Sequence, residues 1–259
     1  MQRSNSLRRS VETDDPVFGA SVATFSAAAV ETFGAAGLDF VWLDFEHSGP
    51  SPYDSTVLED LTRAAEVADI ELFVRLPSGD PSLIRKVLDA GVRTILIPRI
   101  ETAEEVREAV EAARFAVDDS PGDRGIGVGR SSTWGADFDD HAAREDAETF
   151  IGVMIENETA VDNIEEILDV PELGFAFIGP ADLSVSVGQP MEKDHPDVEA
   201  LVDRAESAVR DSSVALAGIR NDPDAITTAI DGGYRILRIG GDLSAARSTL
   251  TDRVDALDR

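Results

Sequence analysis

The chain has 259 residues, of which 42% are hydrophobic, and it carries a formal net charge of -28. The length suits one complete domain, no run reaches the ~18 apolar residues of a membrane span, and the N-terminus lacks the apolar stretch of a secretory signal. The net negative charge would repel nucleic acid and anionic membranes, so binding to either is not expected. The cytoplasm is the expected location. The lack of cysteine excludes disulfides, thiolate nucleophiles and cysteine-ligated zinc, which leaves carboxylate, imidazole or carbonyl ligands for a metal.

The basic residues are unusual, because only Lys86 and Lys193 among the 23 cationic residues are lysines. Such an acidic, lysine-poor surface is typical of adaptation to a salt-rich cytoplasm, where dissolved ions screen the repulsion between carboxylates. An ordinary acidic protein is the alternative interpretation.

After a polar segment at 1–14, short apolar runs alternate with longer segments of helical period. Eight of these runs are predicted strands: 18–23, 40–45, 71–75, 94–98, 151–156, 175–179, 214–219 and 235–240. Eight βα units over this length favour an α/β fold of one domain, a closed (β/α)₈ TIM barrel over 1–259. No G-x-G-x-x-G motif opens a helix after the first run, which counts against an open dinucleotide-binding sheet. The Gly- and Ser-rich residues 116–136 form an insertion that is predicted to be functional or mobile.

Catalytic groups of such a barrel follow the carboxyl ends of its strands. The second predicted strand leads into Asp44 and His47, the third ends at Arg75, and the fifth and sixth lead to Glu156 and Asp182. Because Glu156 and Asp182 follow neighbouring strands, their carboxylates are predicted to bind one hard cation, Mg²⁺, Mn²⁺ or Co²⁺. The alternative is that both residues only cap the helices that follow.

His47 is a candidate acid or base, since Asp44 and Glu46 are near enough in sequence to orient it. An ordinary hydrogen-bonded histidine of the core or of a loop is the alternative. Arg75 ends a buried strand and needs an anionic partner, either a structural carboxylate or an anionic oxygen of the substrate.

The segment GPADLS is expected to place the backbone N–H groups of Ala181 and Asp182 at a helix start, where a carboxylate is favoured. Covalent imine catalysis is not expected, because Lys86 falls within a predicted helix and Lys193 in a polar loop. An enolate would then be stabilised by a metal acting as a Lewis acid together with a cationic side chain.

Several of these motifs, in this order, resemble the HpcH/HpaI aldolase family over about residues 15–245. They are GLDFVWLDFEH, VRLPSGDP, TILIPRIETAEEVREAV, RGIGVGRSSTWG, VMIENETAVDNIEEIL and FIGPADLSVSVG. The resemblance implies a barrel of the phosphoenolpyruvate/pyruvate type and a class II aldolase that reversibly cleaves a 4-hydroxy-2-oxo acid to pyruvate and an aldehyde.

The resemblance also implies roles for individual residues. Glu156 and Asp182 would bind the divalent metal, and pyruvate would chelate it through its carboxylate and keto oxygens. The N–H groups of Ala181 and Asp182 would hold the carboxylate of pyruvate, and Arg75 would stabilise the enolate. Two positions depart from the family pattern: Met154 replaces a usual polar residue, and Arg99 replaces a usual apolar one.

For proton transfer, the resemblance implies that His47 acts through water, with Asp44 and an Asp89 from a neighbouring subunit orienting the network. The family is typically hexameric, a trimer of dimers, with C-terminal helices exchanged between subunits, so residues 244–257 are expected to dock on a partner subunit.

Two other functions compete with the aldolase. A lyase of the citrate lyase β or malyl-CoA type would share the barrel and the metal carboxylates. The sequence shows no obvious basic pocket for the phosphates of CoA, for which Arg99, Arg124 and Arg130 are the candidate contacts. A catalytically silent barrel with a binding role is the other alternative, although an idle site has no physical reason to keep paired carboxylates beside a histidine and an arginine.

Overall fold

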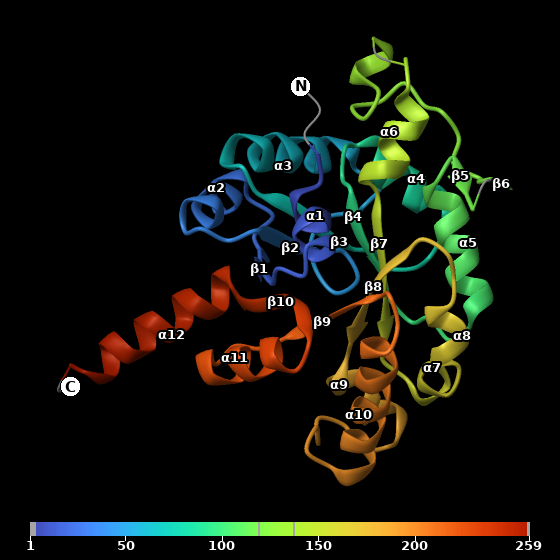
Figure 1. The fold of residues 1–259 in the computed structure, drawn as a ribbon. Coiled ribbons are helices and arrows are strands. Elements are labelled where there is room, and N and C mark those ends of the chain that lie inside the picture. The colour runs from blue at the N-terminus through green and yellow to red at the C-terminus, as the bar shows by residue number, and fades with distance from the viewer. Residues whose placement is uncertain (1–3, 119, 137, 258–259) are drawn as a thin grey trace.

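The computed structural model describes residues 4–118, 120–136 and 138–257. Within these residues, eight parallel strands close into a barrel in the order β1-β10-β9-β8-β7-β4-β3-β2, with helices packed around it (Figure 1). The strands are β1 (Val17–Ser21), β2 (Phe40–Asp44), β3 (Glu71–Arg75), β4 (Thr94–Ile97), β7 (Phe150–Ile155), β8 (Leu173–Ile178), β9 (Ala215–Ile219) and β10 (Tyr234–Gly241). All eight lie within two residues of the predicted runs, and the predicted (β/α)₈ barrel is confirmed.

The helices begin as capping residues predict. Asp80 and Asp222, for example, accept hydrogen bonds from the first backbone N–H groups of the helices that follow them. The helices are α1 (Ser6–Glu12), α2 (Ala27–Ala35), α3 (Ser55–Ala68), α4 (Pro81–Asp89), α5 (Ala103–Ala113), α6 (His141–Glu148), α7 (Glu158–Asp162), α8 (Ile164–Leu168), α9 (Pro180–Ser186), α10 (Pro196–Arg210), α11 (Pro223–Asp231) and α12 (Asp242–Asp255).

The interior of the barrel is filled by side chains, and aromatic rings dominate it. Trp42 stacks on Phe73 at 4.7 Å between ring centroids, and Phe73 contacts Phe175 at 5.2 Å. Gly152 of β7 makes room for this layer, because a Cβ added there would lie 2.1 Å from the ring of Phe175. The outer faces of the same strands pack against the surrounding helices in a second, larger core.

The N-terminal segment closes the barrel at the amino ends of the strands. Leu7 of α1 is fully buried in the same cluster as the interior aromatic residues. Asn5 caps α1 by accepting from the N–H of Arg8, and its side-chain amide donates to Thr94 Oγ1 at 3.0 Å. The segment that the sequence characterised only as polar therefore seals one end of the barrel, although residues 1–3 lie outside the described part of the chain.

The insertion at 116–136 is folded against the barrel where it is described. It contains the short antiparallel strands β5 (Ala116–Val117) and β6 (Ser120–Pro121) and a 3₁₀ turn at Thr133–Gly135; residue 119 falls outside the described ranges. Arg124 is buried and donates to Glu145 of α6 at 2.9 Å. This ion pair fixes the insertion beside α6.

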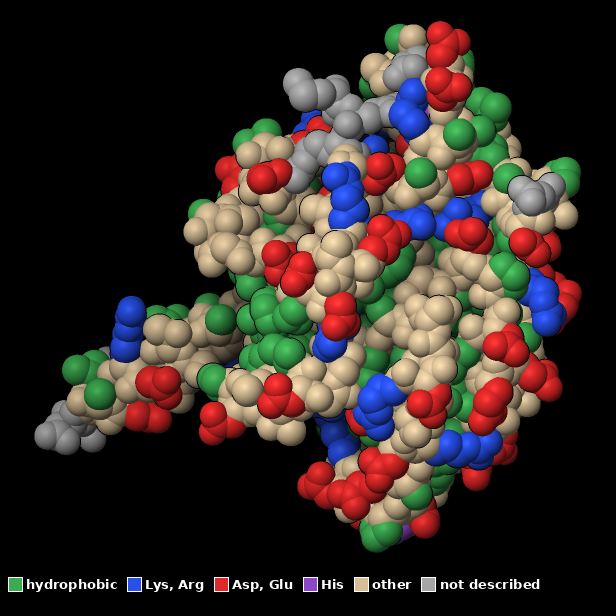
Figure 2. Space-filling view, in the orientation of Figure 1, with side chains coloured by type: hydrophobic (Ala, Val, Ile, Leu, Met, Phe, Trp, Pro, Cys, Tyr) green, Lys and Arg blue, Asp and Glu red, His purple; other side chains and the backbone are tan. Residues whose placement is uncertain are grey.

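Helix α12 differs from the others, since it extends away from the barrel toward the C-terminus (Figure 1) and has no buried residue. Leu243, Leu250, Val254 and Leu257 remain more than 45% exposed on and after it. Acidic side chains are spread over the face in Figure 2, with basic side chains among them, in keeping with the net charge of -28. None of the helices in the described ranges is long and apolar enough to cross a bilayer.

Candidate active site

A cavity of about 610 Å³ opens at the carboxyl ends of the barrel strands. Its wall includes Asp44, His47, Arg75, Ala181 and Asp182, all of which the sequence predicted to share a site. They come together because β2 and β3 are neighbouring strands that end at the same rim, while the first turn of α9 follows β8 on the other side of the mouth.

Glu156 and Asp182 border an adjoining hollow of about 330 Å³, and Asp182 lines both spaces. Glu156 directly follows β7, the neighbour of β8, and is only 6% exposed. Its Oε1 accepts a hydrogen bond of 2.6 Å from the backbone N–H of Arg99, and Asn157 rather than Glu156 caps α7. Glu156 therefore does not cap a helix, which was the alternative to its role as a metal ligand.

The electrostatics of Glu156 are unfavourable for a carboxylate. Burial, opposed by the Arg99 hydrogen bond but reinforced by the charges of Asp182 and Glu46, raises the pKa of Glu156 to about 7. Among the described residues, no Arg or Lys side chain forms an ion pair with it. Negative charge at the ends of β7 and β8 thus exceeds what the neighbouring side chains neutralise.

The side chain of Arg75, at the end of β3, is held by two carboxylates, those of Asp44 at the end of β2 and of Glu46 just after it. Its Nε and Nη2 donate to the two oxygens of Asp44, with 3.0 Å for the Nε bond, and Nη1 lies 2.9 Å from Glu46 Oε2. The guanidinium also lies over the ring of Trp42, 5.7 Å from its centroid. A structural carboxylate, one of the two alternatives for the partner of Arg75, is present, and the guanidinium still faces the cavity.

Asp44 is fixed in its charged form by these contacts. Burial alone raises the pKa of Asp44, but the hydrogen bonds and charge of Arg75, together with the N–H groups of His47 and Glu46, hold it below its ordinary value. The N–H of Glu46 donates to Asp44 Oδ1 at 3.0 Å and that of His47 at 3.3 Å. Asp44 therefore shapes the turn that carries His47.

The imidazole of His47 is 57% exposed, and its Nε2 lies 3.6 Å from Glu46 Oε2. It lines the mouth rather than the core, which counts against an ordinary buried histidine. Glu46 has a larger part than the sequence indicated: its side chain is 7% exposed and contacts Arg75, His47 and Arg99 at once. The indication of this role in the sequence is the position of Glu46, a charged residue between Asp44 and His47.

The two departures from the family pattern both contact this network. Met154 is buried, and its Sδ lies 3.6 Å from Arg75 Nη1. Arg99 has a left-handed backbone (φ 57°) that presents its N–H to Glu156, while its exposed side chain donates to Glu46 Oε1 at 3.0 Å. Lys193 borders the cavity from an exposed loop and does not lie on a strand, and Lys86 lies on α4.

Asp89 is the predicted site residue that this chain does not bring to the mouth. It ends α4 near the amino end of β4, where the backbone of Gly129 and Arg124 Nη2, at 3.8 Å, lie beside it. Burial raises the pKa of Asp89, with the charge of Arg124 opposing this effect. A contribution of Asp89 to catalysis would have to be made in the site of another subunit, as the sequence prediction requires.

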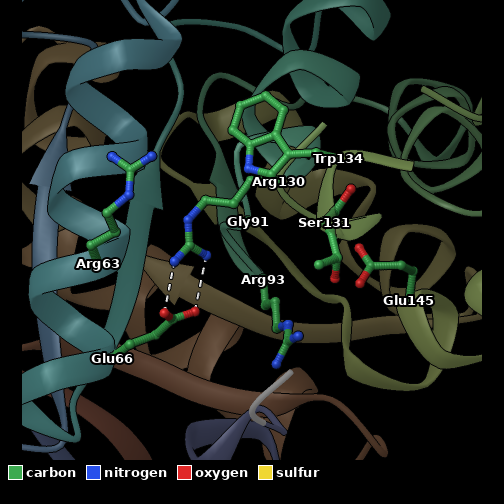
Figure 3. A pocket seen from close by; sticks show the side chains of 9 residues that line it. Arg63, Glu66, Gly91, Arg93, Arg130, Ser131, Trp134 and Glu145 are labelled. Atoms are coloured by element: carbon green, nitrogen blue, oxygen red, sulfur yellow. Dashed lines mark hydrogen bonds and ion pairs between the residues drawn. The ribbon is translucent and has the colours of Figure 1, made fainter. Parts of the chain in front are cut away.

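A second pocket, of about 200 Å³, lies beside the insertion and the amino end of β4. Figure 3 shows Arg130 and Glu66 facing one another there, joined by two hydrogen bonds of 2.9 and 2.7 Å. None of the residues predicted for the aldolase site is among those that line it. Because Arg124 pairs with Glu145 and Arg130 with Glu66 at this end of the barrel, the mouth lacks two of the cations that the CoA-dependent alternative needed.

Known proteins match nearly the whole chain. The profile of the HpcH/HpaI aldolase/citrate lyase family matches residues 18–249. A hydroxypyruvate/pyruvate aldolase of Roseobacter denitrificans is 33% identical, covering 95% of this chain and 94% of its own length. A 2-keto-3-deoxy-L-rhamnonate aldolase of Klebsiella pneumoniae is 31% identical, with coverages of 97% and 92%.

A solved structure agrees with these sequence matches. An HpcH/HpaI aldolase/citrate lyase family protein from Burkholderia cenocepacia superposes with a TM-score of 0.90 at 31% identity, covering 98% of this chain and 99% of that one. The predicted enzyme class, an aldolase, is confirmed. The chain belongs to the HpcH/HpaI aldolase/citrate lyase family.

Proposed function

We propose that this enzyme is a divalent-metal-dependent class II aldolase that reversibly cleaves a 4-hydroxy-2-oxo acid to pyruvate and an aldehyde. The observation that carries the proposal is the buried Glu156 carboxylate, whose pKa is raised to about 7, beside Asp182 at the ends of neighbouring strands. The names of the relatives support it, since both name aldolases that act on oxo acids.

The donor set at this point fits a hard cation such as Mg²⁺, Mn²⁺ or Co²⁺. Glu156 and Asp182 are oxygen donors with surplus negative charge, which a cation would neutralise. Within the described residues, no group of three or more His, Asp and Glu side chains is placed to hold a metal. Two carboxylates are fewer ligands than such a cation takes, so a bound ion would keep positions for water and substrate. When bound, it would supply Lewis acidity toward a substrate oxygen that gains negative charge.

The pyruvate unit would be oriented by groups on both sides of the mouth. The backbone N–H groups of Ala181 and Asp182 open α9 beside the cavity and would bind the carboxylate. Arg75, positioned by Asp44 and Glu46, would donate to the oxygen on which enolate charge develops. Because its two carboxylates fix the guanidinium in advance, little reorganisation is needed as that charge appears.

His47 would transfer the proton of the C4 hydroxyl, directly or through one water. Its exposed imidazole is free to reach substrate, and the turn ordered by Asp44 sets its direction. In the cleavage direction the hydroxyl oxygen loses a proton, the bond between C3 and C4 breaks, and the aldehyde leaves. The enolate then gains a proton at C3 to give pyruvate.

A metal-removal experiment tests the proposal. Aldol addition of pyruvate to short hydroxyaldehydes is measured after dialysis against EDTA and again after adding Mg²⁺, Mn²⁺ or Co²⁺; we expect loss and then recovery of activity. Borohydride with pyruvate serves as the control for imine chemistry, and we expect it to leave the activity intact. Turnover that survives metal removal would contradict the mechanism. Inactivation by borohydride that leaves pyruvate covalently attached to Lys193 would contradict it as well.

We also propose that residues 244–257 dock on a partner subunit in a homo-oligomer, a hexamer built as a trimer of dimers, where Asp89 would join a neighbouring site. The lack of buried residues in α12 and its exposed leucines support this arrangement. Light scattering of the full chain and of a chain ending at residue 241 tests it. We expect a large assembly for the first and a smaller one for the second, and equal masses would contradict the docking.

A further inference from the structure

In the part of the chain that the structure describes, a guanidinium at the mouth of the barrel, that of Arg238, has no carboxylate partner. Arg238 lies on β10, in register with Gly19 of β1 and Ile219 of β9, and its half-buried side chain lines the 610 Å³ cavity. Ile236, two residues earlier, belongs to the cluster inside the barrel. Since side chains alternate along a strand, Arg238 lies on the same inner side, one layer nearer the mouth.

Most of the donors of Arg238 are unused. Nη1 donates to Ser21 Oγ at 3.1 Å, whereas Nε is buried without a partner. In the described ranges, Arg238 forms no ion pair and its Nη2 donates no hydrogen bond. Burial, and to a smaller extent Arg75, lowers the pKa of Arg238, while the charge of Asp44 opposes the effect. A guanidinium that is partly desolvated in this way gains most from an anion that arrives with the ligand.

The other cations of the mouth are already occupied or lie in solvent. Arg75 is paired with Asp44 and Glu46, as described above. Arg220 lies over the ring of Tyr234, donates to its hydroxyl at 3.2 Å and is 3.8 Å from Glu206. Lys193 is exposed on the rim. Among the described residues, Arg238 is therefore the partly buried cation of the cavity wall that has no anion of its own.

The position of Arg238 also fits one end of an extended ligand. In the closed barrel, β10 is two strands away from β8 and three away from β7, whose ends carry Asp182 and Glu156. The apolar side chains of Trp42, Met154 and Phe177 line the same cavity. A ligand anchored beside Asp182 would cross this apolar surface and present its far end to Arg238.

We propose that Arg238 determines specificity by binding a carboxylate on the aldehyde substrate, so that aldehyde acids are the preferred partners of pyruvate. This inference rests on the proposed aldolase function and extends it to the second substrate. Arg238 takes no part in the bond changes: C3 of pyruvate loses a proton and bonds to the carbonyl carbon, and the carbonyl oxygen gains a proton. The competing interpretation is a purely structural Arg238 that only holds Ser21.

The kinetic test compares two aldehydes of equal length, glyoxylate and glycolaldehyde, which differ in a carboxylate. We expect the wild type to have the higher kcat/KM with glyoxylate, and Arg238→Met to lower the ratio of the two kcat/KM values by about 30-fold or more. Arg238→Lys should restore part of the ratio, because it keeps the charge but not the planar fork. Arg107→Met, which removes one exposed charge from α5, should leave the ratio unchanged.

A phosphate group could in principle be the anion, so glyceraldehyde 3-phosphate is compared with glyceraldehyde in the same way. A preference that depends on Arg238 for the phosphate and not for glyoxylate would overturn the carboxylate assignment. A glyoxylate ratio that Arg238→Met leaves unchanged would overturn the role of Arg238 altogether.

A binding experiment separates failure of this inference from failure of the aldolase proposal. Calorimetry compares 2-oxoglutarate with 2-oxopentanoate, which have the same chain length and differ in the terminal carboxylate. We expect tighter binding of 2-oxoglutarate by the wild type and loss of that difference in Arg238→Met. If the wild type catalysed no aldol reaction, the proposed function would fail while this comparison still decided the role of Arg238; equal affinities, including no binding of either acid, would overturn it.

Discussion

Replacing Glu156 with glutamine should change the pH dependence of stability in a predictable direction. In the metal-free protein, burial and two neighbouring carboxylates raise the pKa of Glu156 to about 7 from the ordinary value of 4.5. A group whose pKa is higher in the folded state contributes stability that is present below pH 4.5 and is lost as the pH rises through 7. At 1.36 kcal/mol per pKa unit, the loss amounts to about 3 kcal/mol.

Glutamine resembles the protonated acid in shape and cannot ionise, so Glu156→Gln removes this penalty. Urea denaturation in EDTA, measured between pH 4 and pH 8, should show similar free energies of unfolding for wild type and variant at pH 4. At pH 8 the variant should be more stable by about 3 kcal/mol. Glu108→Gln, which removes one exposed charge from α5, is the matched control and should give a constant difference. A constant difference for Glu156→Gln as well would refute the account of its environment.

The same residue links stability to metal affinity. Below pH 7 a proton competes with the cation for Glu156, so the affinity for Mn²⁺ should fall roughly tenfold for each pH unit. Glu156→Gln should abolish both Mn²⁺ binding and aldolase activity while raising the free energy of unfolding at neutral pH. Substitution of a purely structural glutamate would not produce this combination.

Three further substitutions test other parts of the molecule. Arg75→Met should lower the free energy of unfolding by about 3 kcal/mol, because it leaves Asp44 and Glu46 without their shared cation, and it should abolish turnover; urea denaturation and the aldol assay measure the two effects. His47→Gln should change stability by less than about 0.5 kcal/mol, since the side chain is 57% exposed, but lower kcat roughly 10²- to 10⁴-fold, and an unchanged kcat would remove His47 from the mechanism. Leu7→Ala should cost about 2–5 kcal/mol, because α1 seals the barrel through this side chain, and a neutral effect in urea would mean that the seal is dispensable.

The strands could be predicted from the sequence because their signal is local. In the run 71–75, the residues between Glu71 and Arg75 are all apolar and buried, as expected where both faces of a parallel strand are buried. Charged residues lie at or just after the ends of four runs, and the barrel places these ends at one rim, so Asp44, Arg75, Glu156 and Asp182 were also predictable as neighbours. Both inferences need only the chain order and the period of the strand.

Other features depend on contacts between distant segments. Glu46 follows Asp44 by two residues, but only the folded strand ends bring Arg75 and Arg99 to its carboxylate. The seal formed by Leu7 could not be predicted, because a single leucine in a polar segment has no helical pattern around it. The role of Arg238 was not predicted from the run RILRIG at 235–240. The alternation of side chains along a strand could have indicated that Arg238 points inward with Ile236.

The distribution of charge around the mouth gives the site a direction. Within the described ranges, Glu156 and Asp182 on the side of β7 and β8 form no ion pair with a cation, and Arg238 on β10 forms none with an anion. Between them, Arg75 is balanced by Asp44 and Glu46 and keeps a fixed position. A metal ion at the first side and an anionic substituent at the second would satisfy both imbalances at once, which a ligand in the reverse orientation would not. The same two imbalances therefore predict that the pyruvate end of a 4-hydroxy-2-oxo acid lies beside α9 and the aldehyde end beside Arg238.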